Sequence, residues 1–282
     1  MIEAATTGAL HRELVALRKR HGRIALVPTM GNLHAGHRRL MEEARRHADA
    51  VVASIYVNPL QFGPREDFAS YPRTPAEDRA LLTQADVDLL FAPTAADIYP
   101  RGLAAHTQVE VPELGNILCG AFRPGHFRGV TTVVARLLNL LGPGVALFGK
   151  KDYQQLLLIK LMVADLAMPI EVVGVDTVRE GDGLALSSRN GYLSTEERRQ
   201  APALYVALNR VRELVRAGTG IEVAEETGVR DLVAAGFRPD YVSVRRQYDL
   251  AEPGPGDRSM VVLAAAWLGR TRLIDNLEFE AP

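Results

Sequence analysis

Two histidines three residues apart, His34 and His37, are the side chains of this sequence best placed to do chemistry. They follow a strand predicted over 23–28 and a turn that ends at Gly31, and they stand where a polar, helix-forming stretch begins. Free backbone N–H groups at a helix start attract anions, and side chains at i and i+3 share one face of the first turn. The pattern therefore favours a phosphate or nucleotide site.

Other interpretations of the two histidines stay open at this point. A zinc site would need a third His, Cys or carboxylate at ligand spacing, and the i, i+4 pattern of a metalloprotease helix is missing, so we predict no metal site. His34 could instead serve only as a helix cap. Neither histidine lies in a clear apolar stripe, which argues against a buried structural role.

A second cluster, Gly149-Lys150-Lys151-Asp152, follows a strand predicted over 145–148 and opens a helix predicted over 152–165. Lys and Arg together number 33, and only four of them are lysines, so two adjacent lysines stand out. A compact ammonium group is a good phosphate ligand. Asp152 is equally well explained as a helix cap.

Three loops carry further polar side chains. Leu186-Ser187-Ser188-Arg189 combines two hydroxyls and a guanidinium, which suit the outer phosphates of a nucleotide. Asn58 and Gln61 are amides that can bind hydroxyls and a carboxylate of a small polar substrate, or can be solvated side chains of a turn. The glycine-bounded, basic segment 120–129 is a candidate lid or a plain connection.

The predicted elements place these motifs together. Strands and helices alternate over the first two thirds of the chain, and the strands lack alternation, as expected of a parallel sheet covered on both faces. The carboxyl ends of such strands form one edge, where ligands bind. The strands are predicted over 23–28, 50–57, 87–91, 145–148 and 170–175, and the helices over 37–48, 75–85, 129–141 and 152–165.

Near residue 176 the pattern changes to helices over 195–217 and 221–235, followed by strands over 241–247, 259–266 and 271–277. We therefore predict an α/β fold with two domains. Residues 1–176 form a Rossmann-like parallel sheet with helices on both faces. Residues 177–282 form a smaller C-terminal α+β domain.

Composition limits the function classes. The 282 residues are 47% hydrophobic and 24% charged, as in ordinary globular proteins, and the net charge of −1 gives no general attraction to nucleic acid or to an anionic membrane. No window approaches the roughly 20 apolar residues of a membrane span. A single cysteine, Cys119, and the absence of a signal-peptide pattern predict a cytoplasmic protein.

Neither a P-loop nor a GxGxxG fingerprint occurs, so phosphate recognition must depend on the histidines. Together the motifs closely resemble the pantoate–β-alanine ligase (pantothenate synthetase) family over nearly the whole chain. The His-x-Gly-His element by itself indicates only the wider HxGH nucleotidyltransferase superfamily. The markers are 28–31 with His34 and His37, 57–59 with Gln61, 71–74, 123–127, 151–155, 187–190 and 272–276.

The resemblance implies an AMP-forming carbon–nitrogen ligase of pantothenate and coenzyme A biosynthesis. Pantoate attacks the α-phosphorus of ATP to give pantoyl adenylate and pyrophosphate, and the amine of β-alanine then displaces AMP. Mg²⁺ would arrive with ATP, and the family suggests a homodimer. In such an enzyme residues 1–176 would bind ATP and pantoate, and residues 177–282 would close over the nucleotide site.

The resemblance also implies roles for individual residues. The catalytic residues would be His37, His34 and Lys151. Gln61 and Gln155 would hold pantoate, and Gln61 would also contact β-alanine. The ATP site would comprise Met30, Gly31, Asn32, Leu33, His34, Ala35, Gly36, His37, Gly149, Lys150, Lys151, Asp152, Val178, Leu186, Ser187, Ser188 and Arg189.

The chain departs from the family at three positions, none of which is a proposed catalytic residue. Leu186 stands where methionine is frequent, Lys150 where some relatives are acidic, and Ala85 where glycine is common. Two alternative functions remain. One is a nucleotidyltransferase that stops after transferring an adenylyl or cytidylyl group to a phosphorylated substrate. The other is a nonenzymatic nucleotide-binding protein on the same scaffold.

Overall fold

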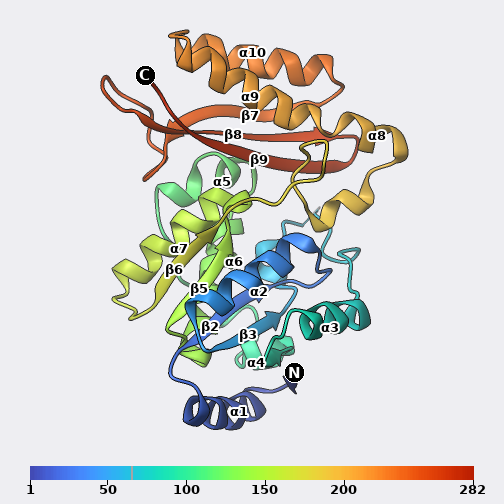
Figure 1. The fold of residues 1–282 in the computed structure, drawn as a ribbon, viewed down its shortest axis with the longest axis vertical. Helices are drawn as coiled ribbons and strands as arrows, with labels where there is room; N and C mark the ends of the chain where they lie inside the picture. The colour runs from blue at the N-terminus through green and yellow to red at the C-terminus, as the bar shows by residue number, and fades with distance from the viewer. Residues whose placement is uncertain (65) are drawn as a thin grey trace. The chain divides into compact units, whose positions relative to one another are not determined.

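The structure is a computed structural model that describes residues 1–64 and 66–282, and the chain divides into two compact units. The first unit comprises Met1–Lys150 and Gln155–Asp176, and the second comprises Lys151–Gln154 and Thr177–Pro282 (Figure 1). The division therefore runs through the turn that carries the two adjacent lysines.

The first unit is built on a six-stranded parallel sheet with the order β1-β4-β3-β2-β5-β6. Strand β2 is central and pairs with β3 on one side and β5 on the other, with Leu26 opposite Val52 and Ala146. The strands are β1 Ile2–Ala4, β2 Ile24–Thr29, β3 Ala50–Ile55, β4 Leu89–Phe91, β5 Val145–Gly149 and β6 Glu171–Val175.

Helices cover both faces of this sheet because its strands are apolar on both sides. Leu26 belongs to a core that contains residues of α1, α6 and α7, whereas Ala25 and Val27 belong to a second core with residues of α2 and α3. The fold class predicted from the sequence is confirmed. The longer helices of this unit are α1 Thr7–Arg20, α2 Ala35–His47, α3 Pro75–Gln84, α6 His126–Leu141 and α7 Tyr153–Asp165.

Short helical pieces connect these elements. They are η1 Pro59–Gln61, α4 Ala95–Ile98, η2 Leu114–Asn116, α5 Cys119–Phe122 and η3 Lys150–Asp152. Strand β1 and helix α1 were not predicted, although Leu10, Leu14 and Leu17 of α1 are buried at helical spacing and Thr6 caps the helix. Helix α6 begins three residues earlier than predicted, after Gly125 in a left-handed conformation.

The second unit is a three-stranded antiparallel sheet, β7-β8-β9, with helices α9 and α10 packed on it (Figure 1). The helix predicted over 195–217 is two helices, because Pro202 lacks the N–H group needed to continue the first. The smaller α+β part of the predicted fold is confirmed. The elements are η4 Ser188–Tyr192, α8 Thr195–Gln200, α9 Ala203–Arg216, α10 Ile221–Ala234, β7 Arg238–Arg246, β8 Ser259–Leu268 and β9 Thr271–Glu280.

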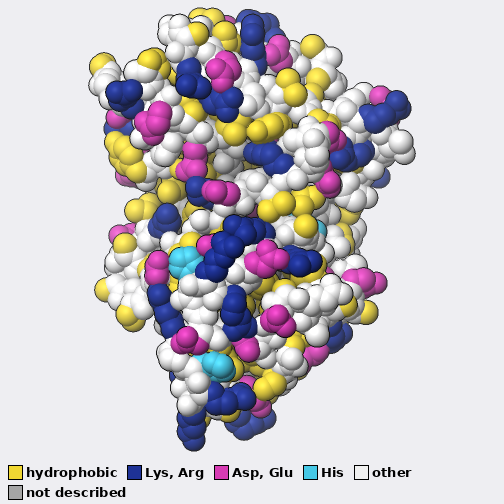
Figure 2. All heavy atoms as spheres, in the orientation of Figure 1, with side chains coloured by type: hydrophobic (Ala, Val, Ile, Leu, Met, Phe, Trp, Pro, Cys, Tyr) yellow, Lys and Arg dark blue, Asp and Glu magenta, His cyan; other side chains and the backbone are white. Residues whose placement is uncertain are grey.

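Charged side chains of both signs are interspersed on the face shown in Figure 2. Many charged side chains of the protein form ion pairs, as Arg38 does with Glu42 at 2.9 Å along the exposed side of α2. Within the described residues, no helix combines the length and the apolar character needed to cross a bilayer.

Candidate functional site

Three predicted motifs follow three neighbouring parallel strands. The histidine turn follows β2, the segment with Gln61 follows β3, and Gly149 ends β5. Because parallel strands present their carboxyl ends at the same edge, these motifs share one edge of the sheet. From β2 the chain continues to β3 on one side of it, while β5 pairs with β2 on the other side. The strand order therefore reverses at the carboxyl end of β2, and α/β proteins commonly bind ligands at such a switch point.

The two histidines cap helix α2 reciprocally. Nδ1 of His34, the N-cap residue, accepts a hydrogen bond from the backbone N–H of Gly36 at 3.1 Å, and Nδ1 of His37 accepts one from the backbone N–H of His34 at 3.3 Å. Their ring centroids lie 4.2 Å apart. Since backbone N–H groups only donate, Nδ1 carries no proton in either ring, and a neutral ring holds its proton on Nε2. Capping therefore makes both imidazoles Nε2–H donors.

The turn before the histidines is held by a buried carboxylate that the sequence did not reveal. Asp78 of α3 is 2% exposed and accepts hydrogen bonds from the backbone N–H groups of Asn32 at 3.1 Å and Leu33 at 2.7 Å. Thr74 donates its hydroxyl to the same carboxylate at 3.1 Å. Gly31 and Asn32 both have positive φ, so this turn needs such support.

The expectation that free backbone N–H groups at this helix start bind the anion is wrong for most of the turn. Each of these groups already donates to Asp78, to a histidine Nδ1 or to the carbonyl of His34. Capping and phosphate binding are thus not alternatives here, because the caps use only the Nδ1 atoms of the two rings. The N–H groups concerned are those of Asn32, Leu33, His34, Gly36, His37 and Arg38.

Gln61, predicted to bind pantoate, is 9% exposed and is oriented by protein contacts. Its Nε2 atom donates to the sulfur of Met30 at 2.9 Å, and its Oε1 atom accepts from Asn58 at 3.3 Å. Asn58 is 1% exposed and also binds the carbonyl of Gly129 and the hydroxyl of Tyr99. Asn58 therefore orients Gln61, whereas the sequence analysis considered that Asn58 binds the substrate directly.

The candidate lid segment holds the Gln61 loop in place. Arg123 pairs with Glu66 and donates to the carbonyl of Gln61 at 3.3 Å. His126 Nδ1 lies 2.8 Å from that same carbonyl, and its Nε2 lies 2.9 Å from Arg123 Nη1. An arginine hydrogen only donates, so Nε2 accepts and Nδ1–H donates to Gln61. The segment is an anchor for the proposed pantoate site.

Replacing Gly129 with alanine is expected to disturb this loop. A Cβ atom at Gly129 would lie 2.2 Å from the carbonyl oxygen of Leu60 and 2.8 Å from the backbone nitrogen of Gln61. The loop must shift, so we expect KM for pantoate to rise about tenfold, with a smaller effect on KM for ATP. Steady-state kinetics would measure this.

Gly8→Ala in α1, where there is space for a Cβ atom, is the control and should leave both constants unchanged. An equal effect of the two substitutions would contradict the explanation.

Glu66 should make stability depend on acid pH. Burial raises the pKa of its carboxyl, but the hydrogen bond and charge of Arg123 outweigh burial and hold the pKa below the ordinary value of 4.5. A carboxyl with a lowered pKa in the folded state stabilises the protein above pH 4.5, and this contribution is lost as the pH falls through the folded-state pKa.

Glu66→Gln should therefore lower the melting temperature near pH 7, and the difference from wild type should shrink below pH 4.5. Thermal unfolding from pH 3 to 8 measures it. Glu42→Gln, which breaks the exposed pair with Arg38, is the matched control and should change little at any pH. A Glu66→Gln difference that is constant across this range would contradict the assignment.

The lysine turn is divided between the two units. In the first unit, Lys150 Nζ lies 2.9 Å from the Asp176 carboxylate, and Gln155 is half-buried near the start of α7. In the second unit, Lys151 Nζ lies 3.8 Å from the exposed carboxylate of Asp152. Asp152 directly precedes α7, in the position considered for a cap.

The serine loop of the second unit is closed at its base by a short antiparallel contact. Arg179 and Ala185 form a β-bridge, and the N–H of Leu186 donates to the carbonyl of Val178 at 2.9 Å. Ser187 caps η4 by accepting a hydrogen bond from the N–H of Arg189. Val178 and residues 186–189, all predicted to contact ATP, are thus neighbours in one structured loop.

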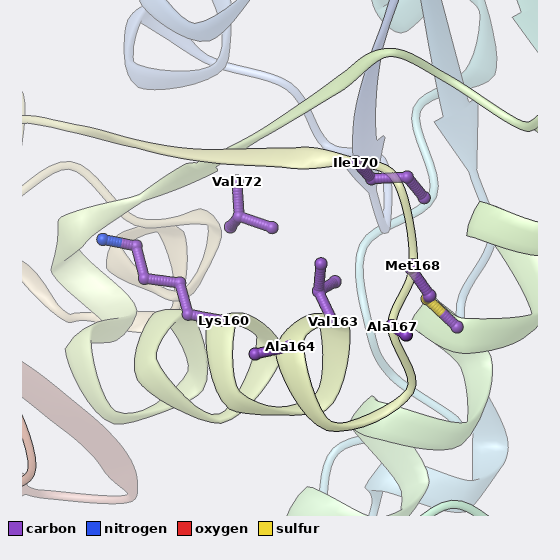
Figure 3. Close-up of a pocket in the computed structure, with 7 residues that line it drawn as sticks. All are labelled: Lys160, Val163, Ala164, Ala167, Met168, Ile170 and Val172. Atoms are coloured by element: carbon purple, nitrogen blue, oxygen red, sulfur yellow. The ribbon is translucent and has the colours of Figure 1, made fainter.

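A pocket of about 490 Å³ lies elsewhere in the first unit, on α7 and β6 (Figure 3). Its lining is apolar apart from the side chain of Lys160, and it contains no residue predicted for substrate binding. Among the described residues, no group of three or more His, Cys, Asp or Glu is arranged to hold a metal ion.

Comparison with known proteins identifies the family. The sequence model described as pantoate-beta-alanine ligase matches residues 3–278. This chain belongs to the pantoate–β-alanine ligase family. It is 59% identical over 256 residues to the pantothenate synthetase of Shewanella amazonensis, covering 91% of each chain. It is therefore an enzyme of this family.

Solved structures of pantoate–β-alanine ligases have the same fold. The pantothenate synthetase of Thermus thermophilus superposes with a TM-score of 0.91 at 50% identity, covering 99% of both chains. The pantoate–β-alanine ligase of Francisella tularensis, solved in complex with beta-gamma ATP and beta-alanine, gives a TM-score of 0.83 at 34% identity, covering 99% of this chain and 97% of that one.

Proposed function

We propose that this enzyme condenses pantoate with β-alanine by way of pantoyl adenylate. A carboxylate oxygen of pantoate bonds to the α-phosphorus of ATP, and pyrophosphate leaves with the electron pair of the broken P–O bond. The β-alanine nitrogen then bonds to the acyl carbon, AMP leaves, and the amine loses a proton. The products are pantothenate, AMP and pyrophosphate.

The reciprocal histidine cap is the observation that carries this proposal. It presents two Nε2–H donors at the sheet edge that also holds the Gln61 amide. Attack by a carboxylate needs phosphate charge to be neutralised and the reactants to be aligned, with no base to activate the nucleophile. Donor imidazoles fit that requirement.

The residue roles implied by the sequence extend this proposal. We assign catalysis to His34, His37 and Lys151, pantoate binding to Gln61 and Gln155, and β-alanine binding to Gln61. Residues 30–37, 149–152, 178 and 186–189 bind ATP, and Mg²⁺ arrives with the triphosphate. In this proposal residues 1–176 bind ATP and pantoate, residues 177–282 close over the nucleotide, and the enzyme is a homodimer.

Isotope exchange between pyrophosphate and ATP tests the reaction sequence. We expect exchange that depends on pantoate and needs no β-alanine, with AMP release only after β-alanine is added. AMP release in the absence of an amine would refute the ligase mechanism. Stable adenylyl transfer to a phosphorylated acceptor would favour a nucleotidyltransferase instead.

A further inference from the structure

Two consecutive polar residues of β9, Asp275 and Asn276, are buried although strand positions of this kind are usually apolar. They are 3% and 6% exposed. In the register of the sheet they lie opposite Ala264 and Leu263 of β8, which holds their backbone firmly. Burying a carboxylate costs free energy unless the carboxylate is paired. The partners of these two side chains therefore indicate their role in the structure.

Asp275 binds the base of the serine loop. Its two carboxylate oxygens accept hydrogen bonds from the Arg179 guanidinium at 2.6 and 2.9 Å. The same guanidinium donates to the carbonyls of Gly183 and Asn276 and lies 4.0 Å from the centre of the Tyr205 ring. Arg179 is therefore held by several contacts, and it forms the β-bridge with Ala185 that leads directly into residues 186–189.

Asn276 binds the lysine turn. Its side-chain amide donates to the backbone carbonyl of Lys151 at 2.9 Å, and its backbone N–H donates to the Asp275 carboxylate at 2.8 Å. Burial raises the pKa of Asp275, while Arg179 and the nearby charge of Lys151 act in the opposite direction. One strand thus holds two segments that are far apart in sequence, each of which carries a group proposed to contact phosphate.

We propose that Asp275 and Asn276 are positioning residues that set the distance between Lys151 and the Ser187–Arg189 loop, so that both engage the same polyphosphate. The inference rests on the proposed ATP-binding role of those two segments. In this proposal neither residue touches the reacting atoms, because their side chains bind Arg179 and the Lys151 backbone carbonyl. They act through the groups they hold, and a shift of about 1 Å in such groups is enough to slow a reaction markedly.

A double-mutant cycle on Asn276 and Lys151 tests this. Asn276→Ala removes one donor and leaves no buried charge, so the protein should fold. We expect it to lower kcat/KM for ATP in pantoate-dependent exchange about tenfold or more. In a Lys151→Ala background the same substitution should cost less than about twofold, because the group it positions is already gone.

The control is Asp240→Asn, which disrupts another ion pair of β9, with Arg272 at 2.7 Å, that binds no proposed ATP segment. It should lower the melting temperature without changing kcat/KM for ATP. Asp275→Asn should lower both the melting temperature and kcat/KM for ATP. Its effect on kcat/KM should be smaller in an Arg189→Ala background, as the effect of Asn276→Ala is in a Lys151→Ala background.

The inference would be overturned if Asn276→Ala lowered kcat/KM for ATP by the same factor in the wild-type and Lys151→Ala backgrounds. A loss of kcat/KM in Asp240→Asn as large as that in Asn276→Ala would also overturn it. A wild-type enzyme with no pantoate-dependent exchange would instead refute the proposed function. The two failures are therefore distinguishable.

Discussion

His37→Ala should lower pantoate-dependent pyrophosphate exchange by about 10²- to 10³-fold, the usual loss when a donor to developing phosphate charge is removed. His37 Nδ1 is occupied by the backbone N–H of His34, so the proposed donor is Nε2–H. The expected loss is in adenylate formation, measured as the exchange rate at saturating ATP and pantoate.

Two further variants separate the chemistry of the histidines from their capping. Glutamine at the third helical position can accept the same backbone hydrogen bond, so His37→Gln should keep the stability of α2 and still be inactive. His34→Asn likewise keeps a good N-cap, whereas His34→Ala should lose about 1 kcal/mol of stability. Exchange close to wild type in His37→Gln would show that His37 serves only as a cap.

Lys151→Ala should have a comparably large effect, a loss of about 10²-fold or more in exchange. The ammonium group is proposed to neutralise phosphate charge, and alanine removes that charge without disturbing the hydrogen bond to the Lys151 backbone carbonyl. Lys151→Arg should recover only part of the activity, because a planar guanidinium does not replace a compact ammonium. Circular dichroism should show an unchanged fold.

Lysine substitutions elsewhere provide the controls for Lys151. Lys160→Ala, beside the apolar pocket on α7, should leave exchange within about twofold of wild type. Lys150→Ala breaks the pair with Asp176 and should have a smaller effect than Lys151→Ala. Equal losses for Lys150→Ala and Lys151→Ala would contradict the specific role given to Lys151.

Local sequence signals were sufficient to predict the fold and the position of the histidines. Three signals lie within one short segment. The apolar run before Pro28 indicates a strand, Gly31 indicates a turn, and the polar stretch from His37 indicates a helix. The lysine turn was located by the same signals. The three strands of the second unit were predicted from three well separated apolar runs after residue 240, whereas their antiparallel pairing was not predicted.

The contacts that hold these motifs could not be predicted, because they join residues distant in sequence. Asp78 lies 46 residues from Asn32 and resembles an ordinary acid in the first turn of a helix. Arg123 lies 57 residues from Glu66, and Asn276 lies 125 residues from Lys151. A single sequence does not reveal which distant partners will meet.

The double cap of α2 also bears on the kind of nucleophile in the proposed reaction. With Nδ1 bound to the backbone, a neutral imidazole already carries its proton at Nε2 and has no lone pair with which to take another. Protonation would turn the cap acceptor into a donor facing an N–H group and would cost the helix that hydrogen bond. The hydrogen bonds of this one helical turn thus favour a donor role for the two rings, and such a role suits a nucleophile that is ionised before it binds, as the carboxylate of the proposed substrate is at neutral pH.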